Sequence, residues 1–373
     1  MDGPTAPNQF AKALSGSGGP PVSVIVPTRR GGLLLRRCLE SLQAQSFPAF
    51  ETILVSDGAG EGVARLAEEY GCRLAALPES RGFAAAVNAG IALAQAPYVV
   101  LLNDDAELHS DWLGRTSAML DSRPEVSFCC GKIYQSDGLL LDNAGDALAA
   151  GGAAWRLGFG RRDAGAFDRP RALLAASCTA TMFRREVFAQ VGTLDEDFIS
   201  YLEDIDLALR CAREGLQGYY LPQAVSRHHG GATLGGGTSR EVFRLLTRNQ
   251  LLLLAKHYPL PLLLRLAPRI LWSQTLWAAL AVRKNRVGAY LSGIAGFLRA
   301  LGGTLRNRRA CSPAEQARLL ALLRQSEAEI YADVSAPDRA RRDAFWTLYF
   351  LFSRPPKRLP PAAEPDIGRL PIP

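Results

Sequence analysis

Short apolar runs alternate with longer stretches of mixed character over the first hundred residues of the chain. Four of these runs are rich in Val, Ile and Leu and read as strands: Val22–Val26, Thr52–Val55, Arg73–Leu77 and Tyr98–Leu102. The stretches between them read as helices. Alternating strands and helices predict an α/β fold with a doubly wound, mostly parallel, Rossmann-like sheet, and such sheets bind ligands beyond the carboxyl ends of their strands.

Polar residues follow each of the predicted strands. In chain order these segments are Pro27-Thr28, Ser56-Asp57-Gly58, Glu79-Ser80-Arg81-Gly82 and Asn103-Asp104-Asp105. Because the carboxyl ends of parallel strands meet at the same edge of a sheet, the four segments are expected to share one rim. The sequence therefore predicts a polar site at that rim.

The remainder of the chain changes character twice. Residues 126–235 mix short apolar runs with Gly-rich turns and contain one acidic helix over Tyr201–Arg213. From Glu241 onward the pattern is almost entirely helical, with a last helix expected near Asp343–Phe352 and a Pro-rich tail behind it. A helical C-terminal region is therefore predicted after the α/β part.

Composition is typical of a folded protein from a reducing compartment. The chain has 373 residues, 48% of them hydrophobic, which is enough for a sizeable core. Its seven cysteines, an odd number without Cys-x-x-Cys spacing, fit neither a disulfide framework nor a structural zinc site. The first twenty residues lack an apolar run and predict a disordered leader, not a signal peptide. A cytoplasmic location is expected.

The N-terminal part of the chain is acidic overall and the C-terminal part is basic. Residues 240–373 hold 22 Lys and Arg against 9 Asp and Glu, whereas residues 1–239 hold 21 against 27. Within 259–309, nine Lys and Arg occur without any acidic residue and are interleaved with Leu, Ile, Trp272 and Trp277. This composition predicts contact with an anionic membrane surface. The alternative is a basic amphipathic helix that is merely solvated on one face.

The same basic stretch has neither the pattern of a membrane span nor that of a nucleic-acid-binding platform. Arg265, Arg269, Arg283 and Lys284 interrupt every apolar run before about 20 residues accumulate. Its aromatic residues are not interleaved along a predicted strand, the usual arrangement for binding single-stranded nucleic acid. No nucleic-acid partner is therefore expected.

Adjacent carboxylates mark two candidate sites. Asp104 and Asp105 follow a strand directly and would repel each other, which a divalent cation such as Mg²⁺ or Mn²⁺ would relieve, although the pair could equally cap a helix that begins near Ser110. Glu203, Asp204 and Asp206 lie near a helix N-terminus, where the helix dipole alone favours acids. Asp204 is the stronger candidate for a general base that takes a proton from an attacking hydroxyl.

Histidine and glycine motifs add two weaker signals. The pair His228-His229 precedes a Gly-Gly step and could complete a metal site or touch a phosphate, although a structural histidine explains either one equally well. Arg81-Gly82 opens a helix of small residues, so a guanidinium and free backbone N–H groups could face an anion there.

Taken together, these motifs resemble those of glycosyltransferase family 2, whose members have the GT-A fold. The resemblance runs from about Val22 to Pro259. It is carried by Val22-Ser-Val-Ile-Val-Pro-Thr28, the strand that ends at Asp57, Arg81-Gly-Phe-Ala-Ala-Ala-Val-Asn-Ala-Gly90, Leu101-Leu-Asn-Asp-Asp105, Phe198-Ile-Ser-Tyr-Leu-Glu-Asp-Ile-Asp-Leu207, His228-His-Gly-Gly-Ala-Thr233 and Arg248-Asn249. Each segment is degenerate, whereas their order and spacing together are specific.

The resemblance implies a role for each matching residue. The implied donor-binding residues are Pro27, Thr28, Asp57, Arg81, Gly82, Asn103 and Asp104, with Asp57 at the base, Arg81 and Gly82 at the diphosphate and Asp104 at the ribose. Asp105 and His228 would hold Mn²⁺ or Mg²⁺, and Asp204 would be the catalytic base. Candidates for acceptor contacts or for support of the site are Glu203, Asp206, His229 and Arg248. The family inverts anomeric configuration, which implies a single displacement with the metal stabilising the departing nucleoside diphosphate.

Within the family, several motifs are similar to those of rhamnosyltransferases of cell-surface polysaccharide assembly. The similarity rests on Leu102-Asn-Asp-Asp105, on the helix with Glu203 and Asp204, and on Arg248-Asn249 before a leucine run. The similarity implies a dTDP-rhamnose, UDP-sugar or similar donor and a lipid-linked saccharide acceptor. The first loop departs from the family pattern at Arg29 and Arg30, as does Ser80 where Asn is frequent. These departures concern donor contacts and not the fold.

The expected organisation follows from this resemblance. Residues 1–20 would be a leader, 21–258 a GT-A domain with a nucleotide-sugar half (21–125) and an acceptor half (126–258), 259–353 a basic helical region on the inner face of the cell membrane, and 354–373 a tail. The alternative is a non-catalytic protein of the same fold that binds sugar nucleotides or serves as a membrane scaffold. A scaffold would need none of Asp105, Asp204 and His228, and the presence of all three favours an enzyme.

Overall fold

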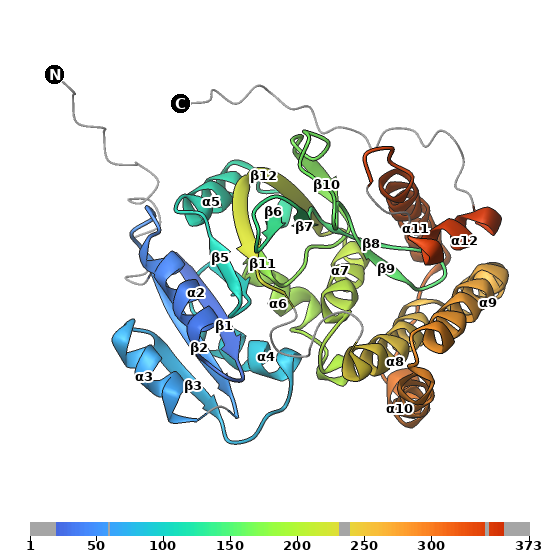
Figure 1. Ribbon diagram of the computed structural model, residues 1–373, viewed down its shortest axis with the longest axis horizontal. Helices are drawn as coiled ribbons and strands as arrows, with labels where there is room; N and C mark the ends of the chain where they lie inside the picture. Colours follow the sequence, from blue (N-terminus) through green and yellow to red (C-terminus); the bar gives the residue numbers. More distant parts are fainter. Residues whose placement is uncertain (1–19, 59, 231–238, 340–342, 354–373) are drawn as a thin grey trace.

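The computed structural model of the chain describes residues 20–58, 60–230, 239–339 and 343–353 (Figure 1). The predicted leader, apart from its last residue, and the predicted Pro-rich tail lie outside these residues.

The first half of the fold is a run of parallel strands with helices between them. Its strands are β1 (Val22–Thr28), β2 (Phe50–Asp57), β3 (Arg73–Leu77) and β4 (Tyr98–Leu102), and its helices are α2 (Leu33–Gln43), α3 (Glu61–Glu69) and α4 (Phe83–Leu93). β1 pairs in parallel with both β2 and β4, and β2 pairs in parallel with β3. All four predicted strands therefore exist, and their carboxyl ends meet at one rim as expected.

The second half extends the same sheet with strands of both directions. Its elements are β5 (Ala106–Leu108), α5 (Trp112–Ser122), β6 (Val126–Gln135), β7 (Leu141–Asn143), β8 (Asp146–Leu148), β9 (Ala154–Arg156), β10 (Arg171–Leu173), β11 (Ala180–Arg184), α6 (Glu186–Val191), η2 (Glu196–Phe198), α7 (Glu203–Arg213) and β12 (Gln217–His228). The strand order is β10-β12-β6-β11-β4-β1-β2-β3. β11 runs antiparallel to both β4 and β6, so the sheet is parallel over β1 to β4 and mixed beyond them.

Helices cover both faces of the sheet, because the buried strands alternate their apolar side chains between the faces. Val24 and Val26 of β1 pack with side chains of α2, α3 and α5 on one face. Ile25 packs on the other face, with side chains of α4, α6 and α7. The doubly wound α/β architecture predicted from the sequence is therefore confirmed.

The C-terminal part is helical, as the sequence predicts. Its helices are α8 (Arg240–His257), α9 (Leu260–Arg283), α10 (Val287–Arg306), α11 (Pro313–Val334) and α12 (Ala344–Phe352). Side-chain caps define several of their starts: Ser239 accepts from the Val242 N–H, and Ser312 forms a capping box with Glu315. Among the described residues, no helix is both long enough and apolar enough to cross a membrane.

These helices gather on the side of the molecule away from β2 and β3 (Figure 1), and α11 supports the small β8–β9 sheet. Ser326 and Glu327 of α11 accept hydrogen bonds from the backbone N–H groups of Leu148 and Ala150, which flank the β8–β9 turn. Asp333, further along α11, accepts from the Trp155 indole at 2.6 Å. One apolar cluster also contains residues from both sides of position 258, so the predicted division there stays a prediction.

Candidate active site

The turn between β4 and β5 carries the predicted acidic pair at the rim of the sheet. Asp104 lies beside the end of β1, where the Thr28 hydroxyl donates to its Oδ2 at 2.6 Å. Burial raises the pKa of Asp104 to about 6, although the hydrogen bond from Thr28 acts in the opposite direction. Thr28 and Asp104, both predicted donor-site residues, are therefore adjacent in space although 76 positions separate them.

The second acid of this turn faces the predicted histidine. His228 Nε2 lies 3.1 Å from Asp105 Oδ1, and the other ring nitrogen, Nδ1, lies 2.9 Å from Asp142 Oδ2. Arg156 donates to the remaining oxygen of Asp142 at 2.7 Å. Burial would lower the pKa of His228, but hydrogen bonds to the two carboxylates raise it to about 9. An unbroken polar chain thus joins β9, β7, β12 and the β4–β5 turn.

Asp105 and His228 fit the requirements of a divalent cation. Asp105 Oδ1 and His228 Nε2 lie 3.1 Å apart in a direct hydrogen bond, so a cation would replace the shared proton and bind a carboxylate oxygen and a neutral imidazole nitrogen, both of which are ligands of divalent cations. Asp142 holds Nδ1, the arrangement that orients metal-binding histidines. Within the described ranges, three or more His, Cys, Asp or Glu side chains do not converge on one point. The protein would supply two ligands and leave the others to diphosphate and water.

We expect Asp142→Ala to weaken Mn²⁺ binding by about 10-fold to 100-fold, because the imidazole would lose the carboxylate that orients it. Electron paramagnetic resonance of free Mn²⁺, in titrations with and without nucleoside diphosphate, measures this affinity directly. Glu107→Ala is the matched control, since Glu107 pairs with the neighbouring His229 at 2.7 Å. Equal Mn²⁺ affinity of Asp142→Ala and the unaltered protein would contradict the orienting role.

His229 turns away from Asp105, although its backbone stays close. Its Nε2 lies 2.7 Å from Glu107 Oε1, while its N–H donates to the Asp105 carbonyl at 2.9 Å. It lines an open polar hollow of about 500 Å³ together with Arg37 and Arg227. Of the two histidines, His228 therefore has the contacts expected of a metal ligand, and His229 supports the strand end.

Asp57, at the end of β2, fastens the loop that leads into α4. Its carboxylate accepts from the Ser80 hydroxyl at 2.8 Å, the Arg81 N–H at 2.7 Å and the Gly82 N–H at 3.2 Å. The Arg81 guanidinium forms an ion pair with Glu196 at 2.6 Å. These contacts keep Ser80, Arg81 and Gly82 at the rim, where the sequence predicts a diphosphate contact.

Gly82 could not be exchanged for a residue with a side chain without moving its neighbours. Its φ is +95°, and a Cβ atom there would lie 2.7 Å from Ile199 Cγ2 and 3.0 Å from the Ile199 carbonyl oxygen. Pro27 is tolerated in β1 because the β1–β4 ladder ends at Ile25, so its missing N–H removes no bond to β4. The local backbone therefore explains why Gly and Pro are accommodated at these two positions.

Asp204 begins α7 beside two other acids. Glu203, Asp204 and Asp146 influence one another electrostatically, and Arg156 favours the ionised form of Asp204. Burial raises the pKa of Asp204 to about 6. Burial and the nearby Asp204 raise the pKa values of Glu203 and Asp146 well above the ordinary carboxyl range. Asp204 accepts a hydrogen bond from the Ile205 N–H at 2.8 Å, and this bond and Arg156 both favour its ionised form.

A strained loop positions this end of α7. Ile199, Tyr201 and Leu202 all have positive φ, between 64° and 70°, which is unfavourable for residues other than glycine. The amide nitrogen of Asn249 in α8 lies 2.7 to 2.9 Å from the carbonyl oxygens of Phe198, Ser200 and Tyr201. The buried Arg248 donates to the Asp197 carbonyl and to the Asn249 side chain. The pair Arg248-Asn249 thus fixes the backbone that leads into Glu203-Asp204.

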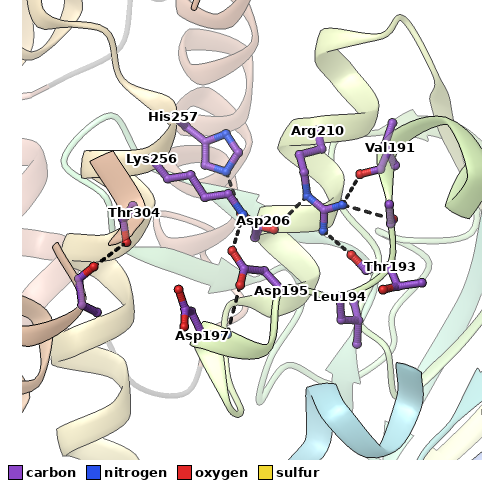
Figure 2. Close-up of polar contacts among 12 residues, drawn as sticks. Val191, Thr193, Leu194, Asp195, Asp197, Asp206, Arg210, Lys256, His257 and Thr304 are labelled. Atoms are coloured by element: carbon purple, nitrogen blue, oxygen red, sulfur yellow. Dashed lines mark hydrogen bonds and ion pairs between the residues drawn. The ribbon is translucent and has the colours of Figure 1, made fainter. Parts of the chain in front are cut away.

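Asp206 lies further along α7, in a buried ionic network (Figure 2). His257 Nε2, Lys256 Nζ and Arg210 Nε approach its carboxylate to 2.8, 2.7 and 2.9 Å. Burial would raise the pKa of Asp206, but the hydrogen bond from His257 and the nearby cations lower it. Arg210 also donates to the carbonyls of Val191, Gly192 and Thr193. These contacts favour a supporting role for Asp206.

Residues 23–192 match the family model described as glycosyl transferase family 2. These residues form a glycosyl transferase family 2 domain. The resemblance found in the sequence is thereby confirmed, while Asp204 and His228 lie beyond the matched residues and their roles stay proposals.

Two curated relatives illustrate the range of proteins that share the family 2 domain. The O-antigen biosynthesis protein RfbC of Myxococcus xanthus is 31% identical over 240 residues, which cover 61% of this chain and 19% of that protein. The N-acetylglucosaminyl-diphospho-decaprenol L-rhamnosyltransferase of Mycobacterium tuberculosis is 27% identical over 235 residues, which cover 55% of this chain and 75% of that protein. The chain spans 25% or less of the length of two of the curated relatives that it matches.

A solved structure agrees with the fold of the family 2 domain. Staphylococcus aureus TarS aligns with a TM-score of 0.50 at 16% sequence identity, over 84% of this chain and 53% of that chain. The predicted GT-A type of α/β fold with a helical region behind it is confirmed.

The sequence predicted most of the polar residues at the rim of the sheet but not all of the residues that hold them in place. Thr28, Asp104, Asp105 and His228 are joined by direct contacts or neighbour one another in the β4–β5 turn. The missed residues are Asp142, Asp146 and Arg156. A signal for the first two existed in Leu141-Asp-Asn-Ala-Gly-Asp146, where two acids flank a Gly turn after an apolar run. Arg156 carried no such signal, because its partner Asp142 is reached only through the fold.

Proposed function

We propose that this protein is an inverting, metal-dependent glycosyltransferase that moves a sugar from a nucleoside diphosphate to a hydroxyl of a lipid-linked saccharide. The observation that carries the proposal is the buried Asp204 at the start of α7, which accepts the Ile205 N–H at 2.8 Å, has Arg156 nearby and has a pKa raised to about 6 by burial. A base of this pKa is ionised at neutral pH and can accept the proton of an attacking hydroxyl.

The donor nucleotide would lie along the ends of β1, β2 and β4. Pro27, Thr28 and Asp104 would contact the nucleoside, and Asp57 would meet the base from the rim. Arg81 and Gly82 would approach the diphosphate, with Asn103 beside them. The Asn103 Oδ1 atom is buried and has no hydrogen-bond partner among the described residues, which is consistent with a polar group kept for a ligand.

Asp105 and His228 would hold the cation, either Mn²⁺ or Mg²⁺. The ion would offset the negative charge that develops on the departing diphosphate. Asp142 and Arg156 would keep His228 in place, and Thr28 would do the same for Asp104. Asp204 would take the proton from the acceptor oxygen as that oxygen attacks the anomeric carbon from the face opposite the leaving group.

The acceptor assignment rests on the relatives and on charge. One relative is named as acting on a decaprenol-linked sugar and transferring L-rhamnose, and another as an O-antigen biosynthesis protein. By analogy, the donor proposed here is dTDP-rhamnose or a similar dTDP or UDP sugar, and the product is part of a cell-surface polysaccharide. Residues 259–353 would contact the inner face of the membrane that contains the acceptor.

A non-catalytic protein that binds sugar nucleotides or serves as a membrane scaffold is the second candidate function. Such a protein would bind the nucleotide at the same strand ends without proton transfer. It would have no use for an ionised acid of raised pKa at the start of α7, and this observation favours the enzyme.

Thermal stabilisation of the full chain by nucleoside diphosphates tests the donor site. A nucleotide at about one hundred times its Kd adds roughly 2.7 kcal/mol to the free energy of unfolding, and we expect this shift with dTDP or UDP only when Mn²⁺ or Mg²⁺ is present. Asp105→Ala is expected to remove the metal-dependent part, whereas Asp111→Ala, at an exposed ion pair with Arg115, is expected to retain it.

Two results of this experiment would count against the proposal. A folded protein that no nucleoside diphosphate stabilises would lack the donor site, which would argue against the enzyme and leave the membrane scaffold. Stabilisation that is independent of metal, together with lack of sugar transfer, would favour the scaffold.

A further inference from the structure

We propose that the exposed faces of α9 and α10 form an interfacial docking surface for an anionic lipid bilayer. This inference deepens the proposed function and rests on it for its biological purpose, since a lipid-linked acceptor lies in a bilayer. Its physical basis is separate from the active site: the surface is defined by side-chain exposure and charge in helices that carry none of the catalytic or metal-binding residues named above.

The first observation is where exposed apolar side chains occur. Among the described residues, fourteen large hydrophobic side chains are exposed, and eight of them belong to α9 and α10. A typical soluble protein scatters such residues singly over its surface. Their concentration on two consecutive helices therefore marks a surface made for contact with something apolar.

The exposed side chains of α9 lie on one face. Leu260, Leu264, Leu271 and Val282 are separated by 4, 7 and 11 residues, which correspond to whole turns of a helix. The opposite face is buried through Leu262, Leu266, Ser273 and Leu276. With 24 residues, α9 is about 36 Å long, so the apolar face extends over most of one side of the helical region.

The next helix repeats this arrangement. Leu291, Leu298 and Leu305 of α10 follow one another at seven-residue spacing and are 58%, 60% and 46% exposed. At the other end of the region, Phe352 of α12 is 75% exposed and packs edge-to-face on Trp272 of α9. Exposed apolar side chains therefore also occur on two helices that pack against α9.

Charge identifies the partner. Residues 259–309 contain nine Lys and Arg and lack acidic residues. Arg269 and Arg309 form ion pairs with Glu327 and Glu214 of other helices. Five others, Arg265, Arg283, Lys284, Arg299 and Arg306, form no ion pair with any residue that the structure describes. An apolar face bordered by unpaired cations is typical of a helix that lies in the headgroup region of an anionic bilayer.

The same charges argue against a second copy of the chain as the occupant. Two copies that met through these faces would bring ten positive charges together. Residues 259–309 of each copy contain no acidic side chain that could neutralise them. Neither α9 nor α10 meets the length and hydropathy required of a membrane span. The geometry therefore points to a helix pair that lies on the bilayer surface.

Co-sedimentation of the full chain with vesicles tests this surface without sugar nucleotide or acceptor. The probes are vesicles of phosphatidylcholine with about 30 mol% phosphatidylglycerol and vesicles of phosphatidylcholine alone. We expect binding to the anionic vesicles that falls as salt is raised. The double variant Leu264→Glu and Leu271→Glu is expected to lower that binding more than tenfold, because two apolar contacts are lost and two anionic side chains are introduced.

Two further variants separate apolar from electrostatic contributions. Arg265→Gln, Arg299→Gln and Arg306→Gln together are expected to weaken binding to anionic vesicles by about 100-fold, since each cation near such a surface strengthens binding several-fold. The matched control is Leu33→Glu with Leu139→Glu, at side chains that are 63% and 59% exposed on other parts of the molecule. All replaced side chains are exposed, so circular dichroism and thermal midpoints should remain those of the unaltered protein.

The outcomes decide between occupants. Undiminished vesicle binding by the α9 double variant, or an equal loss in the Leu33 and Leu139 control, would overturn the proposal. A second result would also overturn it: the unaltered protein binds neither kind of vesicle and is a dimer in light scattering, whereas the α9 double variant is a monomer. Loss of nucleotide binding with normal vesicle binding would instead count against the proposed function alone.

Discussion

Asp204→Asn is expected to lower turnover by about 1000-fold while leaving donor affinity within a few-fold of the unaltered protein. The amide has nearly the shape of the carboxylate but cannot take the proton of the attacking hydroxyl. The measurement is release of nucleoside diphosphate from the donor identified by thermal stabilisation, in the presence of a lipid-linked saccharide. Donor affinity is measured separately by the same thermal stabilisation.

Glu203→Gln is the matched control for this prediction. Burial and Asp204 raise the pKa of Glu203 well above that of an ordinary carboxyl group, which favours the neutral form of this side chain. Exchange of a neutral acid for a neutral amide should therefore reduce turnover less than tenfold. Equal losses in the two variants would show that the site needs an acidic side chain at either position and would remove the reason for assigning the base to Asp204.

The same assignment fixes how the rate depends on pH. Because Asp204 accepts a proton only when ionised, kcat should fall about tenfold for each pH unit below a pKa near 6 and level off above it. Asp104, whose pKa is also raised to about 6, would act through donor binding and therefore through KM. A kcat that stays constant from pH 7 to pH 5 would contradict a base of raised pKa at position 204.

Asn249→Ala is expected to have the second largest effect, although this residue touches neither donor nor acceptor in the proposed arrangement. Its amide holds three carbonyl oxygens of the loop in which Ile199, Tyr201 and Leu202 have positive φ. Removal of these bonds should lower the free energy of unfolding by about 2–3 kcal/mol. A displaced Asp204 should also lower turnover by about 100-fold.

Two measurements distinguish positioning from a simple loss of stability. Chemical denaturation gives the free energy of unfolding, and turnover at a temperature where the variant remains folded gives the catalytic effect. Arg244→Ala, which removes an exposed ion pair with Glu241 on the same helix, should leave both quantities nearly unchanged. Normal turnover by folded Asn249→Ala would show that the start of α7 stays in position without the hydrogen bonds from Asn249.

The sequence by itself determined the α/β order and the location of the polar rim. Apolar runs mark β3 and β4 at the bounds the structure has. β4 is almost continuously apolar because it is buried throughout, whereas β3 lies at the edge of the sheet and its residues are exposed or half-buried. Parallel strands place their carboxyl ends together, so Thr28, Asp57 and the pair Asp104-Asp105 could be assigned to one rim before any contact was known. The local pattern is sufficient to predict strands and their shared rim, because a strand depends on residues that are neighbours in the chain and the rim follows from the parallel direction of the strands.

The tertiary structure alone decided which acid pairs with which cation and which acid stays ionised. Asp142 and His228 are 86 positions apart and meet only because β6 pairs with both β7 and β12. Asp204 and Asp206 look alike in sequence, yet burial beside other acids raises the pKa of Asp204, whereas His257, Lys256 and Arg210 lower that of Asp206. A pKa is set by burial and by charged groups from distant segments of the chain, and neither can be read from the residues next to the acid in the sequence.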